Sequence, residues 1–378
     1  MPPVDGFVAR GFEPVRDAFV ANFEHHDDVG AACAVYRDGE PVVDLWAGFA
    51  DLAGGRMWEQ DTIQLVFSAT KGVTATCVNL LAERGVIDID APIAAYWPEF
   101  AARGKERIPV RWALCHKAGL AAVHADLTLE EVLAWRPVVD AIAAQAPDWE
   151  PGTAHGYHAR TFGWILGELV RRVTGRSLGR FFAEEIARPL GVDFWVGLPR
   201  EELPRCARVI PPEGLPSLVD LFGAGSLAAQ VMHGPSGLFF YDDMWNRPEV
   251  LAAEMPSSNG VGSARALARL YAALVGEVDG VRVLAPDTVE AACVVQADGP
   301  DRVLFLPSCF GLGYTLQPML APGAGRRAFG HPGAGGSLGF ADPERRLGFG
   351  YVTTRMKFDL TGDPRSRGLV AAVYSSLG

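Results

Sequence analysis

The 378-residue sequence predicts an α+β fold, in which an antiparallel sheet built from both ends of the chain carries helices and a mainly helical domain is inserted in the middle. Two observations indicate this: a hairpin pattern near each end, and alanine-rich helical segments between them. A chain of this length exceeds the size at which a single core keeps growing. We expect residues 1–110 with 255–378 to form the sheet domain and 111–254 the helical domain, with the functional site between them.

The hairpin patterns consist of apolar runs on either side of a turn signal. Residues 31–36 and 42–49 flank an Arg-Asp-Gly-Glu turn, and residues 337–341 and 346–353 flank an Asp-Pro-Glu-Arg turn. Short apolar runs around such turns are typical of β-hairpins. Strands are therefore predicted at both ends of the chain.

The helical segments show apolar residues at three- and four-residue spacing. This spacing predicts helices over 129–145, 161–174, 178–188 before Pro189, and 265–275 after a capping loop at residues 257–260.

Charge and cysteine usage narrow the function classes. The net charge of −11 argues against nucleic-acid and anionic-membrane partners. The N-terminal residues do not have the pattern of a signal peptide, and no apolar run has the length of a membrane span. The six cysteines are scattered singly, which favours free thiols in a reducing cytoplasm over disulfides or a zinc site. We expect a cytoplasmic protein.

Ser68 and Lys71 form the first candidate site. An apolar run at residues 63–67 leads into Ser68, and apolar residues at 73, 77, 80 and 81 predict a buried helix that ends at Gly85. Lys71 lies three residues after Ser68 and so shares its helix face. A serine hydroxyl needs a base, and burial near a helix N-terminus lowers the pKa of a lysine enough for it to act as one.

Two further arguments bear on this pair. The chain has 4 Lys and 30 Arg, and Arg cannot replace a lysine base. Chance matches to a Ser-x-x-Lys pattern number only ~0.14 for this composition. The alternative interpretation is a serine that caps the helix, followed by an ordinary lysine.

Two other stretches have the composition of functional loops. Residues 149–159 form a Pro/Gly loop with His and Tyr directly before a helix, where Tyr157 is either functional or a packed aromatic residue. Residues 329–339 are rich in glycine before a strand, which either admits a ligand close to the backbone or marks an edge strand with a bulge.

Together the three stretches resemble the serine β-lactamase and penicillin-binding protein superfamily, and in particular its family VIII carboxylesterase branch. The residues that carry the resemblance are Ser68-Ala69-Thr70-Lys71, Tyr157-His158-Ala159 and His331-Pro332-Gly333, in the family's order, with support from residues 186–191 and 263–268. Two departures stand out. Ala159 replaces the Asn of the second motif, and His331, which is mostly neutral at pH 7, replaces the lysine of the third.

The resemblance implies a beta-lactamase-like fold and a mechanism. Ser68 is expected to attack an ester carbonyl, Lys71 with Tyr157 to move the proton, and the N–H groups of Ser68 and Ala334 to form the oxyanion hole. His331, Gly333 and His158 are the expected substrate-binding residues. No metal or organic cofactor is needed, and the expected partner is a small uncharged ester.

The open alternatives are a β-lactamase or D-peptidase, an acyltransferase, and a binding protein without activity on the same fold. The acyl chain, the alcohol and the oligomeric state are left open.

Three local patterns suggest other kinds of site. Residues 335–339 match the G-x-S-x-G elbow of α/β-hydrolases, but no histidine follows Ser337, so that triad order cannot be built. Residues 323–328 resemble a dinucleotide fingerprint without a βαβ unit around it. Residues 24–28, Glu-His-His-Asp-Asp, are consistent with a metal site, although a solvated turn is the more typical interpretation.

Overall fold

The computed structural model describes residues 3–214, 218–358 and 362–378. Within these residues the main sheet is antiparallel, with strand order β1-β3-β2-β13-β12-β11-β10-β9-β8 and β4 paired to β3. Its strands are β1 (Val4–Val8), β2 (Gly30–Arg37), β3 (Glu40–Asp51), β4 (Arg56–Met57), β8 (Ala297–Pro300), β9 (Pro307–Phe310), β10 (Thr315–Leu316), β11 (Phe329–Pro332), β12 (Leu338–Asp342) and β13 (Leu347–Thr353). A second, small sheet joins β5 (Gln64–Leu65), β7 (Gly260–Gly262) and β6 (Phe194–Val196).

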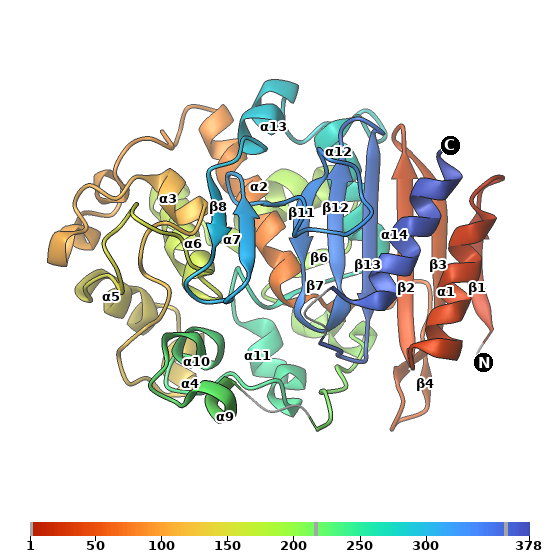
Figure 1. The fold of residues 1–378 in the computed structure, drawn as a ribbon, viewed down its shortest axis with the longest axis horizontal. Helices are drawn as coiled ribbons and strands as arrows, with labels where there is room; N and C mark the ends of the chain where they lie inside the picture. The colour runs from red at the N-terminus through yellow and green to blue at the C-terminus, as the bar shows by residue number, and fades with distance from the viewer. Residues whose placement is uncertain (1–2, 215–217, 359–361) are drawn as a thin grey trace.

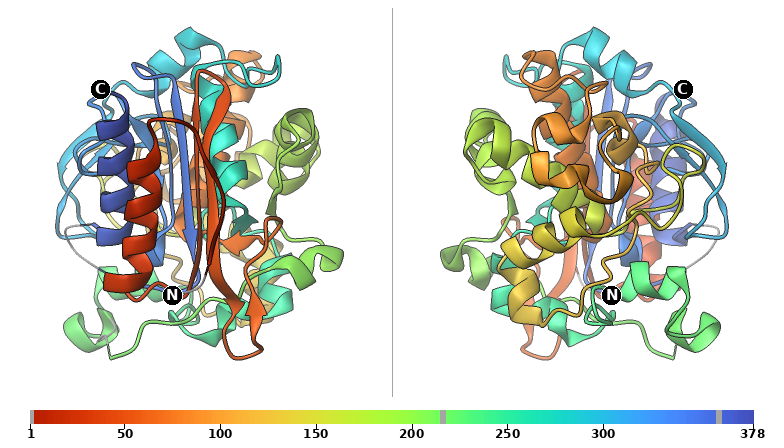
Figure 2. Two further views of the ribbon diagram at one scale, coloured as in Figure 1. Left: turned by 90° about the vertical axis from the view of Figure 1, so that its right-hand side faces the viewer. Right: turned by 90° about the vertical axis from the view of Figure 1, so that its left-hand side faces the viewer.

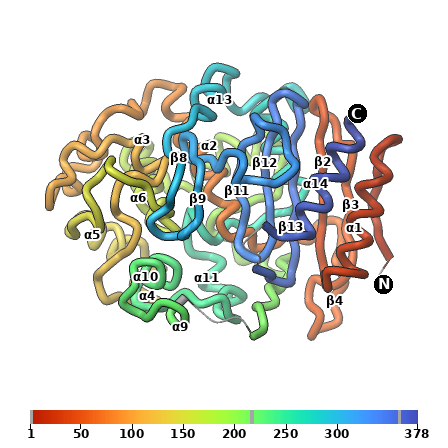
Figure 3. The backbone as a smooth tube through the Cα atoms, in the orientation of Figure 1, coloured from red at the N-terminus to blue at the C-terminus, as the bar shows by residue number. Residues whose placement is uncertain are grey.

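Both predicted hairpins are confirmed as β2–β3 and β12–β13. The two hairpins lie side by side, because β2 pairs with β13 in a register that places Val35 opposite Phe349. The two ends of the chain therefore meet in the middle of the sheet, as the adjacent red and blue segments of Figure 3 show. This pairing confirms the α+β prediction of a sheet built from both termini.

Helices cover both faces of the sheet (Figure 1). On one face lie α1 (Glu13–His25) and α14 (Pro364–Ser376), whose apolar residues, including Phe19 and Leu369, pack with Phe340 of the sheet in one core. On the other face lie α12 (Ala264–Val275) and, behind it, α2 (Thr70–Glu83) (Figure 2). α2, which carries Lys71, is buried along most of its length.

The middle of the chain is mainly helical, and its segments lie on the side of the molecule away from the termini (Figure 1). Its helices are α3 (Val110–Leu114), α4 (Leu129–Leu133), α5 (Arg136–Ala144), α6 (Thr161–Thr174), α7 (Leu178–Phe182), α8 (Arg188–Leu190), α9 (Leu218–Phe222), α10 (Leu227–His233) and α11 (Pro248–Ala252), and α13 (Pro286–Ala292) follows α12. Shorter turns are η1 (Phe67–Ala69), η2 (Ile93–Ala95), η3 (Pro98–Gly104), η4 (Ala183–Ala187), η5 (Arg200–Arg205), η6 (Asp243–Asn246) and η7 (Ala334–Gly336). The domain boundaries stay a prediction.

The prediction of one helix over 129–145 is wrong. The segment is two helices, α4 and α5, separated at Trp135, whose φ of 68° lies in the left-handed region. Pro137 explains the break, because a proline lacks the N–H that a continuous helix needs and clashes with the preceding turn. The apolar periodicity continues across the break, which is why the sequence pattern did not reveal it.

Two other helix ends differ from expectation. The helix predicted over 178–188 continues to Leu190 through the wide π turn η4, so Pro189 lies inside the last turn instead of after it. The helix at 265–275 is confirmed as α12, but its cap is Ser263, whose hydroxyl accepts a hydrogen bond from the Ala266 N–H, and not the loop at 257–260.

The six cysteines are free thiols in the structure, and none forms a disulfide. Among the described helices, none combines the length and apolar character that a bilayer crossing requires.

Candidate active site

Ser68 lies in the short turn η1, which leads directly into α2. The preceding residue, Phe67, has a φ of 48°, a left-handed conformation that is costly for a side chain of this size. The turn is held by Thr70, whose hydroxyl donates to the Phe67 carbonyl and accepts from the Gly260 N–H. The N-cap residue of α2 is Ala69 and no side chain caps the helix, so the alternative interpretation of Ser68 as a capping serine does not hold.

Lys71 is fully buried, and its side-chain nitrogen lies near three oxygen atoms. Lys71 Nζ lies 3.4 Å from Ser68 Oγ, 2.7 Å from the Ala159 carbonyl oxygen and 3.0 Å from the Ser257 carbonyl oxygen. The close approach of Ser257 requires Gly163 on α6, because a Cβ there would stand 2.5 Å from the Ser257 backbone nitrogen. Three segments distant in the sequence thus converge on one amine.

The surroundings of Lys71 favour its neutral form. Burial, and then the nearby charge of Arg160, lower the pKa of Lys71 well below its ordinary value. A neutral amine has two N–H groups and one lone pair. Because the two carbonyls accept the two N–H groups, the lone pair is left to face the Ser68 hydroxyl. This arrangement suits a base that takes the proton from Ser68.

Tyr157 lies next to Ser68 and Lys71. Its phenol interacts with Ser68, and its ring lies 4.7 Å from Lys71 Nζ. Burial raises the pKa of Tyr157, so the phenol is neutral at physiological pH and can donate a hydrogen bond. Of the two groups in contact with Ser68, Lys71 is therefore the one able to accept a proton.

The glycine-rich segment brings a second backbone N–H toward Ser68. Gly333, which directly follows β11, lies so close to the chain before Ser68 that a Cβ at 333 would stand 2.2 Å from the Val66 carbonyl oxygen. Ala334 follows at the start of η7. Among the described residues, no carbonyl accepts a hydrogen bond from the Ser68 or the Ala334 N–H. The two N–H groups are thus available to an oxyanion.

His331, in β11, is buried and neutral. Burial, and then the charge of Lys71, lower the pKa of His331 to about 3. Its Nδ1 donates to the Pro332 carbonyl at 2.7 Å, which leaves Nε2 as a bare acceptor, buried and without a partner in the described part of the chain. The ring stands 6.0 Å from that of Tyr157. The third motif therefore presents a hydrogen-bond acceptor where a lysine would present a cation.

His158 is fully buried and both of its ring nitrogens are occupied. Nδ1 lies 2.6 Å from the Gly156 carbonyl, and Nε2 accepts from the Leu120 N–H at 3.1 Å. The backbone N–H of His158 donates to His116 Nδ1. Neither ring nitrogen is left for a substrate. The geometry thus gives His158 a part in holding the Tyr157 loop and does not support the predicted substrate contact.

A small pocket opens beside Ser68. Its lining combines apolar and aromatic side chains with one cation: Phe67, Ser68, Ala159, Arg160, Met232, Tyr241, Trp245 and Ser258. The sequence pattern missed most of this lining, although Arg160 directly follows the second motif and Ser258 lies in the loop that was interpreted as a cap.

The other candidates from the sequence lie elsewhere. Ser337 is buried in the turn before β12, where its carbonyl accepts from the Gly333 N–H. Residues 323–328 lie in the connection between β10 and β11 and open no helix. In the stretch 24–28, Asp28 pairs with Arg365 and Asp27 with Lys357, and within the described residues no group of three or more His, Cys, Asp or Glu side chains is arranged to hold a metal.

Known proteins of similar sequence and structure show the family of this chain. A family model described as Beta-lactamase matches residues 17–372. Esterase/beta-lactamase LipL of Mycobacterium tuberculosis (strain ATCC 25618 / H37Rv) is 40% identical over 356 residues, which cover 91% of this chain and 81% of LipL.

Two solved structures superpose over nearly the whole chain. A crystal structure of a family VIII carboxylesterase has a TM-score of 0.91 and 38% identity, and covers 99% of this chain and 100% of its own. EstA from Arthrobacter nitroguajacolicus Rue61a has a TM-score of 0.88 and 35% identity, with 98% of this chain and 97% of EstA covered. By its sequence match, its fold and its motifs, the chain belongs to the beta-lactamase family, in the family VIII carboxylesterase branch.

Proposed function

We propose that the protein is a serine carboxylesterase that hydrolyses small, uncharged, short-chain acyl esters through an acyl-enzyme on Ser68. The observation that carries the proposal is the environment of Lys71, which is buried, bonded to two carbonyls and 3.4 Å from the Ser68 hydroxyl. A serine with a neutral lysine as its base is a nucleophile. The esterase names of LipL and EstA support the same reaction class.

In the first half of the proposed reaction, Ser68 Oγ attacks the ester carbonyl while its proton passes to Lys71 Nζ. The N–H groups of Ser68 and Ala334 stabilise the developing oxyanion, and the Tyr157 hydroxyl donates to the reacting oxygens. Lys71 then gives the proton to the leaving alcohol as the carbonyl–oxygen bond of the ester breaks. The acyl group remains on Ser68.

In the second half, water attacks the acyl-enzyme. Lys71, neutral again, accepts a proton from the water and returns it to Ser68 Oγ as the acid leaves. Atoms and protons balance over the cycle, and the residues present suffice for each step. An alcohol in place of water would give acyl transfer by the same route.

The family's activity on β-lactams and D-peptides is the second candidate, since LipL carries both esterase and beta-lactamase in its name. The chemistry of the third motif disfavours it here. A lysine would give a substrate carboxylate a charge-assisted hydrogen bond, whereas His331 Nε2 offers a lone pair that repels a carboxylate. Ala159 also lacks the amide that an Asn would supply. The cytoplasmic location expected from the sequence stays a prediction.

A direct test compares two substrates on one enzyme preparation. We expect kcat/KM for 4-nitrophenyl butyrate to exceed that for a chromogenic cephalosporin by at least ~100-fold, because the ester needs only the nucleophile, the oxyanion donors and the pocket. Mass spectrometry of the quenched acyl-enzyme should place the butyryl group on Ser68. Comparable values, or a preference for the cephalosporin, would favour the β-lactamase alternative.

A further inference from the structure

Arg160 is the one charged residue among those that line the pocket beside Ser68. Arg160 directly precedes α6 and follows the Tyr157 loop. Its guanidinium packs over the rings of Phe239 and Trp245. The residue is 6% exposed. A permanent cation therefore forms part of the wall of a pocket whose other lining side chains are apolar, aromatic or serine.

The hydrogen bonds of Arg160 leave its charge uncompensated. Nη1 donates to the carbonyls of Val231 and Met232 at 3.1 and 2.8 Å, and Nη2 donates to the Phe239 carbonyl at 3.4 Å. Nε has no partner in the described part of the chain, and within those residues no Asp or Glu forms an ion pair with Arg160. Its buried neighbours supply dipoles but no counter-charge.

A buried cation without a carboxylate is unusual, because removal of a charge from water costs several kcal/mol unless a partner offsets it. Burial lowers the pKa of Arg160 to about 10, which still leaves the group charged at neutral pH. A guanidinium binds a carboxylate more strongly than it binds carbonyl oxygens, because the acceptor is ionised and the pair can be bidentate. The missing partner can come from a ligand that occupies the pocket.

The proposed mechanism assigns the pocket to the acyl part of an ester. The group that returns the proton to the leaving alcohol is Lys71, assisted by Tyr157, and neither residue lines the pocket. The leaving alcohol must lie next to these groups, so the acyl chain is the part directed toward Arg160.

We propose that Arg160 forms a subsite for a carboxylate at the far end of the acyl group, so that half-esters of aliphatic dicarboxylic acids are preferred substrates. The inference rests on the proposed esterase function and extends it, since neutral short-chain esters remain substrates. The third motif has the neutral His331 in place of a cationic lysine. Arg160 then supplies a cation on the acyl side of Ser68.

The test compares mono(4-nitrophenyl) adipate with the matched 4-nitrophenyl ester of adipic acid monoamide. The two acyl chains have the same length and differ in a terminal carboxylate or amide. A six-carbon diacid is used because shorter half-esters lose nitrophenol by intramolecular attack of their own carboxylate. Ser68→Ala supplies the background rate. The readout is the ratio of the two kcat/KM values on one preparation, which does not depend on the fraction of active enzyme.

We expect the wild-type enzyme to favour the carboxylate by about tenfold or more, as one additional charge-assisted hydrogen bond implies. Arg160→Gln should bring the ratio to one or below, and Arg160→Lys should keep part of the preference because it keeps the charge. Arg208→Gln, which removes a charge at an exposed pair with Asp243, is the matched control and should leave the ratio unchanged.

A wild-type ratio near one overturns the inference, as does a ratio that Arg160→Gln leaves unchanged. If Arg160→Gln does not fold, the wild-type ratio and the Arg160→Lys ratio decide the question in the same way. If neither ester is turned over above the Ser68→Ala background, the proposed function itself fails, which is a different result from hydrolysis without a carboxylate preference.

Discussion

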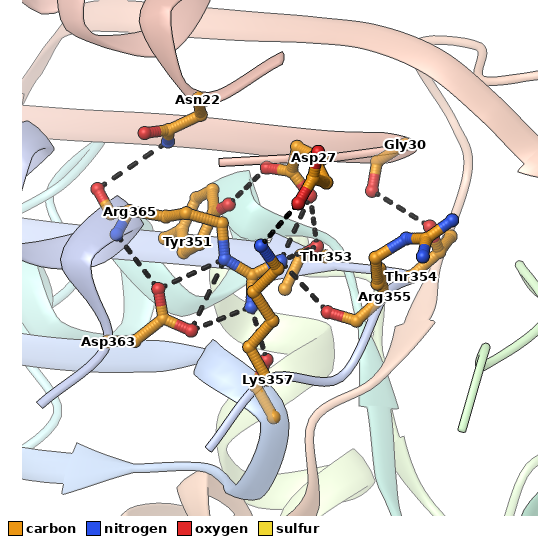
Figure 4. A network of polar contacts seen from close by, with 12 residues as sticks. Asn22, Asp27, Gly30, Tyr351, Thr353, Thr354, Arg355, Lys357, Asp363 and Arg365 are labelled. Carbon is orange, nitrogen blue, oxygen red and sulfur yellow. Dashed lines mark hydrogen bonds and ion pairs between the residues drawn. The ribbon is translucent and has the colours of Figure 1, made fainter. Parts of the chain in front are cut away.

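Arg365 and Arg160 are both buried guanidinium groups, yet their partners differ. Arg365, at the start of α14, pairs with Asp28 and Asp363 and donates to the carbonyls of Arg355 and Gly335. Figure 4 shows this network, in which Asp363 and Arg365 face each other near the end of β13. Arg160, in contrast, contacts carbonyl oxygens alone and lies in the wall of the pocket.

The comparison separates two uses of a buried charge. The Arg365 network joins β13, the residues before β2 and the turn that carries Ala334. Each of its charges has a partner, so the network stabilises the fold. The region of Arg160 and Lys71 keeps a guanidinium and a neutral amine without carboxylates beside a reactive hydroxyl. Charges left unpaired by the fold are available to a substrate or to proton transfer.

The largest effect should fall on activity in the pocket region. Ser68→Ala should lower kcat/KM for 4-nitrophenyl butyrate by about 10⁴-fold or more, because the nucleophile acts with its base as a unit. The free energy of unfolding should change little. Ser337→Ala is the control and should keep most of the activity, since no histidine follows Ser337 in the chain to complete the triad of that elbow motif. An inactive, folded Ser337→Ala together with an active Ser68→Ala would refute the assignment.

The next effect concerns the base. Lys71→Arg should lose nearly as much activity as Lys71→Ala, about 10²–10⁴-fold, because arginine keeps the charge but cannot accept a proton. Steady-state rates on folded protein, checked by circular dichroism, measure this. Substantial activity in Lys71→Arg would assign Lys71 a structural part like that of Arg365.

The Arg365 network should respond in stability. Arg365→Met should lower the free energy of unfolding by about 3–5 kcal/mol, because it leaves Asp28 and Asp363 buried without a cation. Urea denaturation measures the change. Arg346→Met, at an exposed pair with Asp38, is the control and should cost less than about 1 kcal/mol. Equal losses in both variants would mean that the buried network contributes no more than a surface pair.

The smallest effect joins Arg160 to Lys71. The charge of Arg160 lowers the pKa of Lys71, so its removal in Arg160→Gln raises that pKa. Since the neutral amine is the active form, kcat/KM falls as pH drops through the pKa of Lys71. The acidic limb of the pH profile should therefore move to higher pH in Arg160→Gln and stay near its wild-type position in Arg160→Lys. A limb that moves to lower pH, or does not move, would contradict the electrostatic coupling.

Several features could be predicted from the sequence because they depend on neighbours along the chain. The spacing of Ser68 and Lys71 places both groups on one helix turn, and the alternation around two turn signals specifies the β2–β3 and β12–β13 hairpins. Where a local rule competed with periodicity, as at Pro137 in the predicted helix 129–145, the periodic pattern concealed the break.

Other features were decided by the tertiary structure alone. The Ser257 carbonyl lies 186 residues from Lys71 in the chain, and its contact with the amine depends on the packing of Gly163 against the 257 loop. The sequence likewise does not indicate that Arg365 is paired with carboxylates and Arg160 is not. The physical reason is that the free energy of a buried charge depends on the hydration it loses and on the partners it gains. Both are set only when distant segments pack together.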